Sequence, residues 1–209
     1  MIFEIAVVGP LAVNCFILGD AAAGEGAIID PGDEAEKVLA TVKRLGISIR
    51  YVINTHGHFD HVGGNRQVLA ATGARLLIHR DDSAFLSRAA DVANMYGMTT
   101  ENSPPPDQFL DEGVAIRFGR FEMQVLHTPG HTPGGCCLYL EEQGKVITGD
   151  TLFAEGVGRT DFPGSSHDAL MHGIRTKLMT LPDSTVAYPG HGPSTTIGHE
   201  KRYNPYLGG

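Results

Sequence analysis

The sequence predicts a layered, mixed α/β fold. Three observations lead to this fold class. Strand-like runs come in groups instead of alternating strictly with helices, amphipathic helices are interspersed among these groups, and neither an internal repeat nor a low-complexity linker divides the chain. The length of 209 residues suits one domain or two small halves packed closely together. We therefore expect a sandwich of sheets and helices instead of a purely parallel sheet.

The first elements are short strands followed by a helix. Residues 2–8 and 13–18 are rich in β-forming residues and are parted by Gly9 and Pro10. A third run, AII at 27–29, ends at the turn sequence DPG. Apolar residues then recur at helical spacing up to residue 45. The spacing of Asp33 and Glu36 predicts an acidic capping box at the start of this helix, and Gly46 predicts its end.

A buried type of strand, IRYVI at 49–53, leads directly into a histidine-rich turn. The glycine pair after this turn loosens the chain before a second helix, predicted over 65–72, and a strand over 75–78. Residues 81–113 are less regular, with a short helix around 82–93 and three consecutive prolines that exclude regular structure. This segment has two interpretations, a lid or a plain connection.

The second half of the chain repeats the mixture of strands and helices. Four strands are predicted at 114–118, 121–126, 136–140 and 145–148. They are followed by a helix, a strand and a last short helix, predicted at 166–179, 184–188 and 196–203.

Composition excludes several classes of protein. The net charge of -8 and the lack of a basic run argue against nucleic-acid and anionic-membrane partners. No apolar run approaches the roughly 18 residues of a membrane span, and the N-terminus is typical of a strand instead of a signal peptide. Three cysteines without a C-x-x-C pair are a poor disulfide framework, so we interpret them as buried apolar side chains. A cytoplasmic location is the expectation that follows.

The stretch INTHGHFDHVGG at 53–64 concentrates metal-binding side chains in one turn. Residues two apart on an extended turn point the same way, so His56 and His58 are predicted to face one metal ion, and Asp60 and His61 beyond the bend a second. In a chain of this composition the H-x-H-x-D-H pattern is expected by chance in roughly one case in a thousand.

Three more candidate ligands lie in comparable surroundings further along the chain. His131, Asp150 and His191 each follow a strand-like run and lie in a loop rich in glycine or proline, where rigid folds place chemistry. Five imidazoles and two carboxylates are too many for one tetrahedral ion but suffice for two. The predicted sets are His56, His58, His131 and Asp150 for the first ion, and Asp60, His61, His191 and Asp150 for the second. Zn²⁺ accepts these ligands, and iron or manganese would also fit.

The turn THGHFDH, together with His131, Asp150 and His191 in this order, resembles the metallo-β-lactamase superfamily of binuclear hydrolases. The resemblance spans nearly the whole chain. It implies an αββα sandwich over residues 1–209, with two divalent metal ions at one edge of the two sheets. Asp150 stands where the commonest subclass of β-lactamases has a cysteine ligand, which argues against antibiotic hydrolysis.

Two longer stretches, TGDTLFAEGVGRTDFPG and YPGHGPSTTIGHEKRYNPYL, resemble the short glyoxalase II-like hydrolases. This implies hydrolysis of a small thioester, similar to S-lactoylglutathione, by a hydroxide that bridges the metals. Asp60 would be both a ligand and the acceptor that orients this hydroxide. The chain is expected to lack the additional C-terminal helical domain of full-length glyoxalase II, which places glutathione itself in question.

Other residues carry weaker predictions. By resemblance, Arg159 contacts the carboxylate of a glutathione-like substrate; the alternative is a structural ion pair with Asp161. Asp30 either orients a metal-bound histidine through its second ring nitrogen or forms the turn before a proline. No metal is assigned to the five remaining histidines, His79, His127, His167, His172 and His199.

Three alternative functions remain open from the sequence. The motif GRTDF also resembles persulfide dioxygenases, in which one iron would be held by His56, His131 and Asp150. A nuclease shares the histidine turn, but the acidic balance argues against it. A non-catalytic metal-binding module is the third. The sequence does not specify an oligomeric state.

Overall fold

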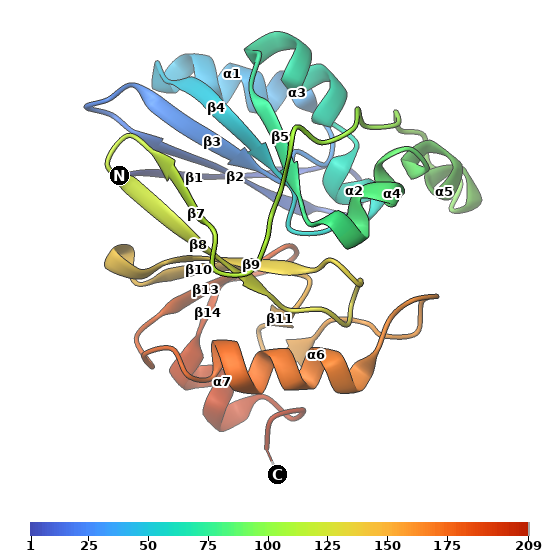
Figure 1. The fold of residues 1–209 in the computed structure, drawn as a ribbon, viewed down its shortest axis with the longest axis vertical. Coiled ribbons are helices and arrows are strands. Elements are labelled where there is room, and N and C mark those ends of the chain that lie inside the picture. The colour runs from blue at the N-terminus through green and yellow to red at the C-terminus, as the bar shows by residue number, and fades with distance from the viewer. Residues whose placement is uncertain (209) are drawn as a thin grey trace.

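Two six-stranded sheets lie face to face at the centre of the molecule (Figure 1). The computed structural model describes residues 1–208. The first sheet comes from the N-terminal half of the chain and the second from the C-terminal half. Each contributes one face to the space between them.

The first sheet has the order β1-β2-β3-β4-β5-β6. Its strands are β1 (Ile2–Val8), β2 (Val13–Asp20), β3 (Glu25–Ile29), β4 (Ser48–Ile53), β5 (Arg75–Ile78) and β6 (Gln108–Phe109). The first three strands are antiparallel hairpins, whereas β3 to β6 run parallel to one another. This mixture explains why the sequence shows both tight turns and helical connections.

The second sheet has the order β14-β13-β10-β9-β8-β7. Its strands are β7 (Ala115–Phe118), β8 (Phe121–His127), β9 (Cys136–Leu140), β10 (Lys145–Gly149), β13 (Val186–Pro189) and β14 (Thr195–Thr196). Neighbouring strands are antiparallel except β10 and β13, which are parallel. A separate ribbon joins β11 (Leu152–Phe153) to β12 (Gly156–Val157).

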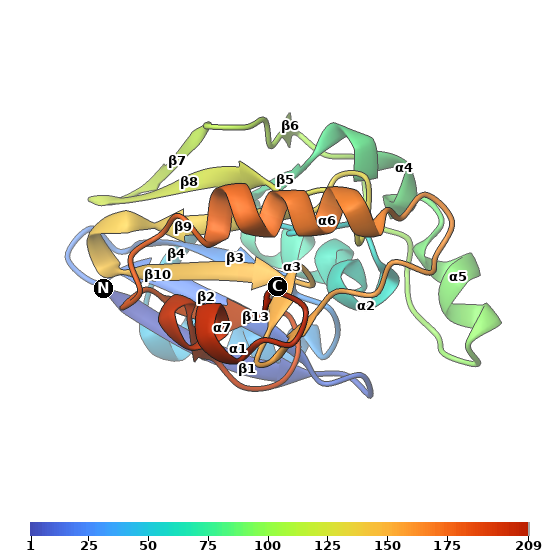
Figure 2. The same ribbon diagram turned by 90° about the horizontal axis from the view of Figure 1, so that it is seen from below.

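Helices cover the two outer faces, which completes four layers. The helices are α1 (Ala35–Leu45), α2 (Phe59–Val62), α3 (Asn65–Thr72), α4 (Ser83–Leu86), α5 (Ala89–Met95), α6 (His167–Gly173) and α7 (Ile197–Tyr203). In Figure 1 α1 and α3 lie above the first sheet, and Figure 2 shows α6 and α7 across the second. The predicted αββα sandwich is therefore confirmed.

Three apolar clusters hold the four layers together. Strand β2 is buried along its whole length because it has apolar layers on both faces. Cys15 and Ile17 belong to the cluster under the outer helices, whereas Phe16 and Leu18 belong to the cluster between the sheets. This alternation with a period of two is what a strand requires. A third cluster fills the space between the second sheet and α6 and α7.

The ends of α1 show one correct and one wrong prediction. Gly46 ends the helix in a left-handed conformation, with its N–H bonded to the carbonyls of Val42 and Lys43, as expected. The capping box of Asp33 and Glu36 is wrong. The N-cap residue is Glu34, which has a positive φ of 47° and whose carboxylate accepts a hydrogen bond from Gly9 N–H at 3.0 Å. A contact with the β1–β2 hairpin has replaced local capping.

Most other predicted elements lie within two residues of their positions in the structure. The helix predicted over 65–72 is α3, and the strand predicted over 75–78 is β5. The helix predicted over 166–179 begins as α6 and continues as a π-helical stretch, Ile174–Leu178. The single short helix predicted around 82–93 is two helices, α4 and α5.

The loops that carry the candidate ligands emerge from the same edge of the sandwich. Strands β3 and β4 are parallel and end just before Asp30 and His56. Strands β8, β10 and β13 share one direction in the second sheet and end just before His131, Asp150 and His191. Strand ends of both sheets therefore deliver side chains to one place. No helix within residues 1–208 is long and apolar enough to cross a membrane.

Candidate metal centre

The seven side chains predicted as ligands form one cluster. Potential ligand atoms lie within 4.8 Å of one another in three overlapping groups. These groups are His56, His58 and His131; His56, His61 and Asp150; and Asp60, His61 and His191. Four loops far apart in the sequence thus meet as expected. Whether each of the seven binds an ion stays a prediction.

Asp150 lies between the two predicted sets. Its Oδ1 is 3.5 Å from Nε2 of His61. Its Oδ2 is 3.6 Å from Nε2 of His131 and 3.6 Å from Nε2 of His191. A carboxylate in this position has oxygens available to both sets, as the shared ligand of the prediction requires.

One turn of helix separates the two sets in the histidine-rich stretch. His58 is extended and precedes α2, and the N–H of His61 donates to the carbonyl of His58 at 3.0 Å. This turn directs the Asp60 carboxylate towards His191, whereas the His61 ring stays beside that of His56, with ring centroids 4.1 Å apart. The Oδ2 atom of Asp60 consequently lies 3.4 Å from Nε2 of His191 and 3.7 Å from Nε2 of His61.

Hydrogen bonds fix the ring orientation in the second set. Nδ1 of His61 lies 3.0 Å from Oδ2 of Asp30, and Nδ1 of His191 lies 2.9 Å from the carbonyl oxygen of Leu11. Both partners are acceptors, so each Nδ1 carries the proton in the neutral ring. The two Nε2 atoms therefore present lone pairs, and they face each other at 3.2 Å. Two lone pairs at this distance repel unless a proton or a metal cation lies between or beside them.

Two of the histidine rings in the first set are oriented in the same way, with a protonated Nδ1 held by an acceptor. Nδ1 of His131 donates to the carbonyl oxygen of Arg159 at 2.8 Å. The Thr55 hydroxyl donates to Asp30 at 2.6 Å, which leaves its oxygen to accept from Nδ1 of His56 at 3.2 Å. Nε2 of His56 and Oδ1 of Asp150 are buried and have no hydrogen-bond partner among the described residues. Such orphaned acceptors fit metal ions, which satisfy them directly.

Electrostatics also favour positive charge at the second set. Burial lowers the pKa of His61, but the carboxylates of Asp150, Asp60 and Asp30 outweigh it and raise this pKa to about 10. Burial acts to raise the pKa of Asp60, but His61 and His191 hold it below its usual range. A cation that binds here takes the place of a proton. The donors present therefore fit divalent metal ions.

Arg159 is engaged in the ion pair that was the alternative to substrate binding. Its Nε and Nη2 donate to the two carboxylate oxygens of Asp161 at 3.0 and 2.8 Å. Its guanidinium also lies over the ring of Phe162, 4.4 Å from the centroid. Both charged side chains are exposed, so this pair contributes little to stability and a carboxylate ligand could replace Asp161.

Asp82 joins two loops of the candidate site, and no pattern in the sequence predicted this. Its carboxylate is buried and accepts two backbone N–H groups, Gly57 at 2.8 Å and Gly134 at 2.6 Å. Gly57 lies between His56 and His58, and Gly134 follows His131 by three residues. Asp82 thus ties together the two loops of the first set. Only its position just after β5, in an irregular segment, could have drawn attention to it.

Asn14 performs a similar task for the loop of His191. Its side-chain amide donates to the carbonyls of Pro189 and Gly192, both at 2.9 Å, and its backbone N–H donates to Gly190 at 2.7 Å. The hairpin β1–β2 is thereby joined to the second sheet. In the sequence Asn14 was a polar residue with no assigned role.

A fourth group with ligand potential lies outside the cluster, formed by His79, Asp81 and His127. The rings of His79 and His127 are stacked, with centroids 4.0 Å apart and planes inclined by 10°. The lone pair of an imidazole nitrogen points outward in the plane of the ring. Because the planes of the two stacked rings are nearly parallel, their lone pairs do not converge on one point close to both rings. Nδ1 of His79 also accepts from the Asp81 N–H at 3.3 Å. The two rings pack as a stack, and the expectation that neither binds a metal stays a prediction.

Comparison with known sequences identifies relatives that match the chain over nearly its full length. An uncharacterized protein of Aquifex aeolicus is 40% identical over 210 residues, covering 100% of this chain and 98% of its own. The hydroxyacylglutathione hydrolase GloC of Haemophilus influenzae is 38% identical over 209 residues, covering 99% of this chain and 98% of its own.

Three solved structures share the fold closely. The B3 metallo-beta-lactamase BLEG-1 has a TM-score of 0.93 at 33% identity, with full coverage of both chains. TTHA1623 in a di-iron-bound form has a TM-score of 0.90 at 38% identity, covering 98% of this chain and 100% of the other. ETHE1 from Myxococcus xanthus has a TM-score of 0.82 at 30% identity, covering 98% of this chain and 84% of the other.

The family model "Metallo-beta-lactamase superfamily" matches residues 8–191, a range that begins in β1 and ends at the last candidate ligand. This match, the relatives and the four-layer fold agree with the histidine turn that first indicated the family. The chain belongs to the metallo-beta-lactamase superfamily.

Proposed function

We propose that the protein is a metal-dependent hydrolase of a small thioester, of the S-lactoylglutathione type, with two divalent ions bound by the seven clustered side chains. The observation that carries the proposal is the inward orientation of lone pairs in both histidine sets around Asp150. The 38% identity with a hydroxyacylglutathione hydrolase supports the thioester substrate. Zinc is our first choice of metal, and the di-iron-bound neighbour makes iron the main competitor.

A pair of divalent ions supplies, when bound, Lewis-acid polarisation of a carbonyl and a water acidic enough to act near neutral pH. The side chains of this protein have separate tasks. Asp30, Thr55 and the carbonyls of Leu11 and Arg159 hold the imidazole rings in one tautomer. Asp60 stays ionised because His61 and His191 lower its pKa, so its carboxylate can accept a hydrogen bond from the nucleophilic water and orient it.

The overall reaction consumes one water molecule. A bond forms between the water oxygen and the thioester carbonyl carbon, and the carbon–sulfur bond breaks. One proton of the water ends on the departing sulfur, and the products are a carboxylic acid and a thiol. No serine or cysteine nucleophile takes part in this scheme. The three cysteines are buried, which agrees with it.

Two other reactions deserve direct comparison. The likeness to BLEG-1, which is named a B3 metallo-beta-lactamase, makes a β-lactam amide a substrate to compare. Persulfide dioxygenation with one iron on His56, His131 and Asp150 is the second alternative. The complete second set beside these residues argues for hydrolysis, since a mononuclear site would leave Asp60, His61 and His191 without a ligand role.

The test combines metal analysis with three assays on the same preparation. We expect two metal equivalents per chain and hydrolysis of S-lactoylglutathione well above that of a β-lactam, without oxygen uptake on glutathione persulfide. An Asp60→Asn variant that retains both metals should lose about 100-fold in kcat, the usual scale for a residue assisting proton transfer. One iron per chain with oxygen uptake and no hydrolysis would reject the proposal, and full turnover in Asp60→Asn would reject the role of Asp60.

A further inference from the structure

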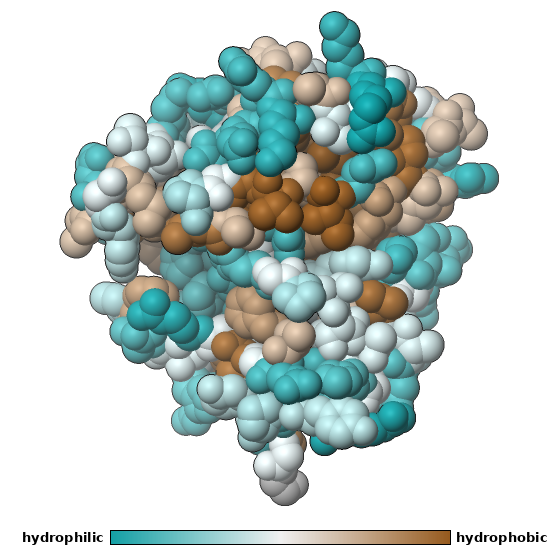
Figure 3. Space-filling model, turned by 180° about the vertical axis from the view of Figure 1, so that it is seen from behind, coloured by the Kyte–Doolittle hydropathy of each residue, from teal (hydrophilic) through white to brown (hydrophobic). Residues whose placement is uncertain are grey.

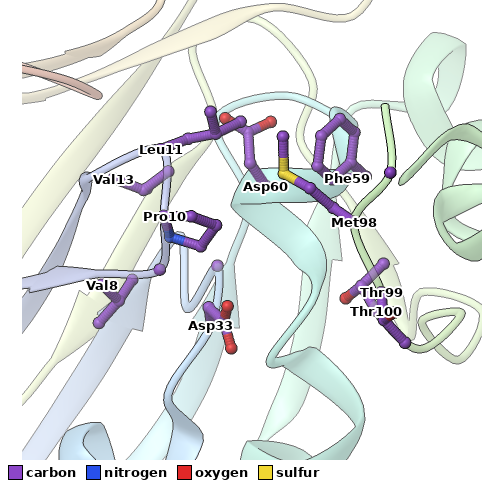
Figure 4. A pocket seen from close by; sticks show the side chains of 13 residues that line it. Val8, Pro10, Leu11, Val13, Asp33, Phe59, Asp60, Met98, Thr99 and Thr100 are labelled. Atoms are coloured by element: carbon purple, nitrogen blue, oxygen red, sulfur yellow. The ribbon is translucent and has the colours of Figure 1, made fainter. Parts of the chain in front are cut away.

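A pocket lies directly beside Asp60, on the side of the second set. Its volume is about 340 Å³. One wall is the tip of the β1–β2 hairpin with Pro10 and Leu11, and another is the segment around Met98, between α5 and β6. In Figure 4 the side chains of Leu11, Phe59, Met98 and Asp60 lie close together at one end of this pocket, and Asp33 lies at the other.

The pocket is apolar where it adjoins the candidate metal centre. Apart from Asp60, its side chains at this end are hydrocarbon, aromatic or thioether, and Leu11 remains 40% exposed although it has apolar neighbours. The same hairpin also leaves Ile5 and Val7 exposed, and Figure 3 shows apolar side chains gathered on the half of the molecule that contains the first sheet. Exposed apolar surface next to a reactive centre is typical of a ligand site.

The pocket offers no basic partner to an anionic ligand. None of its lining residues within the described chain is basic, whereas Asp33 and Asp60 are acidic. A substrate carboxylate placed here would be repelled and would find no Arg or Lys to bind it. The hydrocarbon walls favour an apolar group over a charged one.

The opposite side of the metal centre has the complementary character. Phe162 lies against His58, with ring centroids 5.5 Å apart, and the Arg159 guanidinium covers the Phe162 ring. An exposed guanidinium above an aromatic ring suits the carboxylates of an anionic thiol such as glutathione. The two sides of the centre therefore differ in charge and polarity, as the two halves of an acyl thioester do.

We propose that the pocket beside Asp60 binds the acyl group of the thioester and that this acyl group is a hydrocarbon chain longer than lactoyl, with the thiol half along Arg159 and Phe162. This inference rests on the proposed thioesterase function and specifies its substrate class. It also gives a role to the segment 81–113, whose function the sequence left open, since Met98 forms the wall of the pocket that faces Phe59.

The first test is a series of glutathione thioesters with acetyl, lactoyl, butyryl, hexanoyl and octanoyl groups. We expect kcat/KM to rise about fourfold for each buried methylene, the ratio that corresponds to transfer of one methylene from water, and to level off when the pocket is full. In Met98→Ser the ratio of octanoyl to acetyl kcat/KM should fall at least tenfold. Met95→Ser is the matched control because Met95 is 82% exposed on α5 and does not line the pocket.

A binding measurement separates this inference from the proposed function. S-octylglutathione and S-methylglutathione are thioethers that cannot be hydrolysed, and calorimetry gives the ratio of their Kd values for each variant. We expect octyl to bind at least tenfold more tightly than methyl, and Met98→Ser but not Met95→Ser to remove this preference. Equal binding of both thioethers, or a preference unchanged in Met98→Ser, would overturn the pocket assignment even if thioesters are hydrolysed. Absence of all hydrolysis with an intact octyl preference would instead reject only the thioesterase function.

Discussion

Asp30 and His61 form a hydrogen bond 3.0 Å long between two side chains that are completely buried. The same carboxylate accepts the backbone N–H and the hydroxyl of Thr55, at 2.8 and 2.6 Å. Asp30 also has a positive φ of 51°, a conformation that costs energy in a residue other than glycine and is typical of functional sites. The sequence left two interpretations of Asp30, an acid that orients a metal-bound histidine and a turn before a proline; it contacts His61 and precedes Pro31, and its role towards a metal ion stays a prediction.

Replacing Asp30 with Asn should weaken binding of the second metal ion. Three donors converge on the carboxylate, but an amide has one acceptor oxygen and would turn its NH₂ group towards another donor. We expect a loss of about 10- to 100-fold in affinity for the second ion, the usual effect of removing a partner of a ligating histidine. Zinc titration followed by calorimetry measures it. Asp91→Asn, an exposed residue of α5, is the control; wild-type affinity in Asp30→Asn would show that the hydrogen bond does not orient His61.

The candidate ligands and Asp30 could be predicted from the sequence, but the other residues that hold the site together could not. The ligands could be predicted because the H-x-H-x-D-H turn is local and because each later ligand follows a strand. Asp82, Asn14 and the carbonyl of Leu11 could not, since each acts on a residue 25 to 180 positions away and has no local pattern. Glu34 shows the same limitation, because a contact with Gly9 replaced the local cap. The strands β6 and β14 have two residues each, too few for any periodicity.

Asp82→Asn should disturb the first set of ligands and leave the second intact. One of the two N–H groups, of Gly57 or Gly134, would lose its acceptor because the amide offers only one oxygen. Leaving a buried donor unsatisfied costs about 1–3 kcal/mol of stability, and the loops of His58 and His131 would be less firmly joined. Denaturant unfolding and stepwise metal titration measure the two effects. Asp81→Asn is the control, because the neighbouring Asp81 side chain is exposed. Equal stability of the two variants would contradict the role assigned to Asp82.

The cysteines should be inert in the native protein. Cys15, Cys136 and Cys137 are buried, and burial raises the pKa of each thiol, that of Cys137 to about 11 in spite of hydrogen bonds from Thr128 and Thr151. At pH 8 a thiol with such a pKa is ionised in about one molecule in a thousand, and only the thiolate reacts. We expect no alkylation of the native protein by iodoacetamide and no loss of hydrolysis at pH 8. In guanidinium we expect all three cysteines to be labelled, as measured by mass spectrometry. Labelling of the native chain with inactivation would indicate a thiol in the mechanism.

Gly190 is a position where adding a single methyl group should damage the metal centre. A Cβ atom built on Gly190 would collide with Oδ1 of Asp150 and lie 2.7 Å from Cε1 of His61, so the shared carboxylate would have to move. Gly190 is also held on both sides by backbone hydrogen bonds, since its N–H donates to Gly149 and its carbonyl accepts from Asn14. The backbone therefore cannot easily retreat, and the displacement falls on the ligands.

We expect Gly190→Ala to fold, to bind less than two metal equivalents and to lose about 100-fold in kcat/KM, since a shift of about 1 Å in a positioning group can cost that much. Gly156→Ala is the matched control, because the nearest atom to a Cβ there is 3.7 Å away, an ordinary contact. Elemental analysis and hydrolysis of the same thioester check both variants. If Gly190→Ala held two ions and turned over normally, Asp150 could not be the ligand that the two sets share, because the variant forces this carboxylate out of the place where both sets meet.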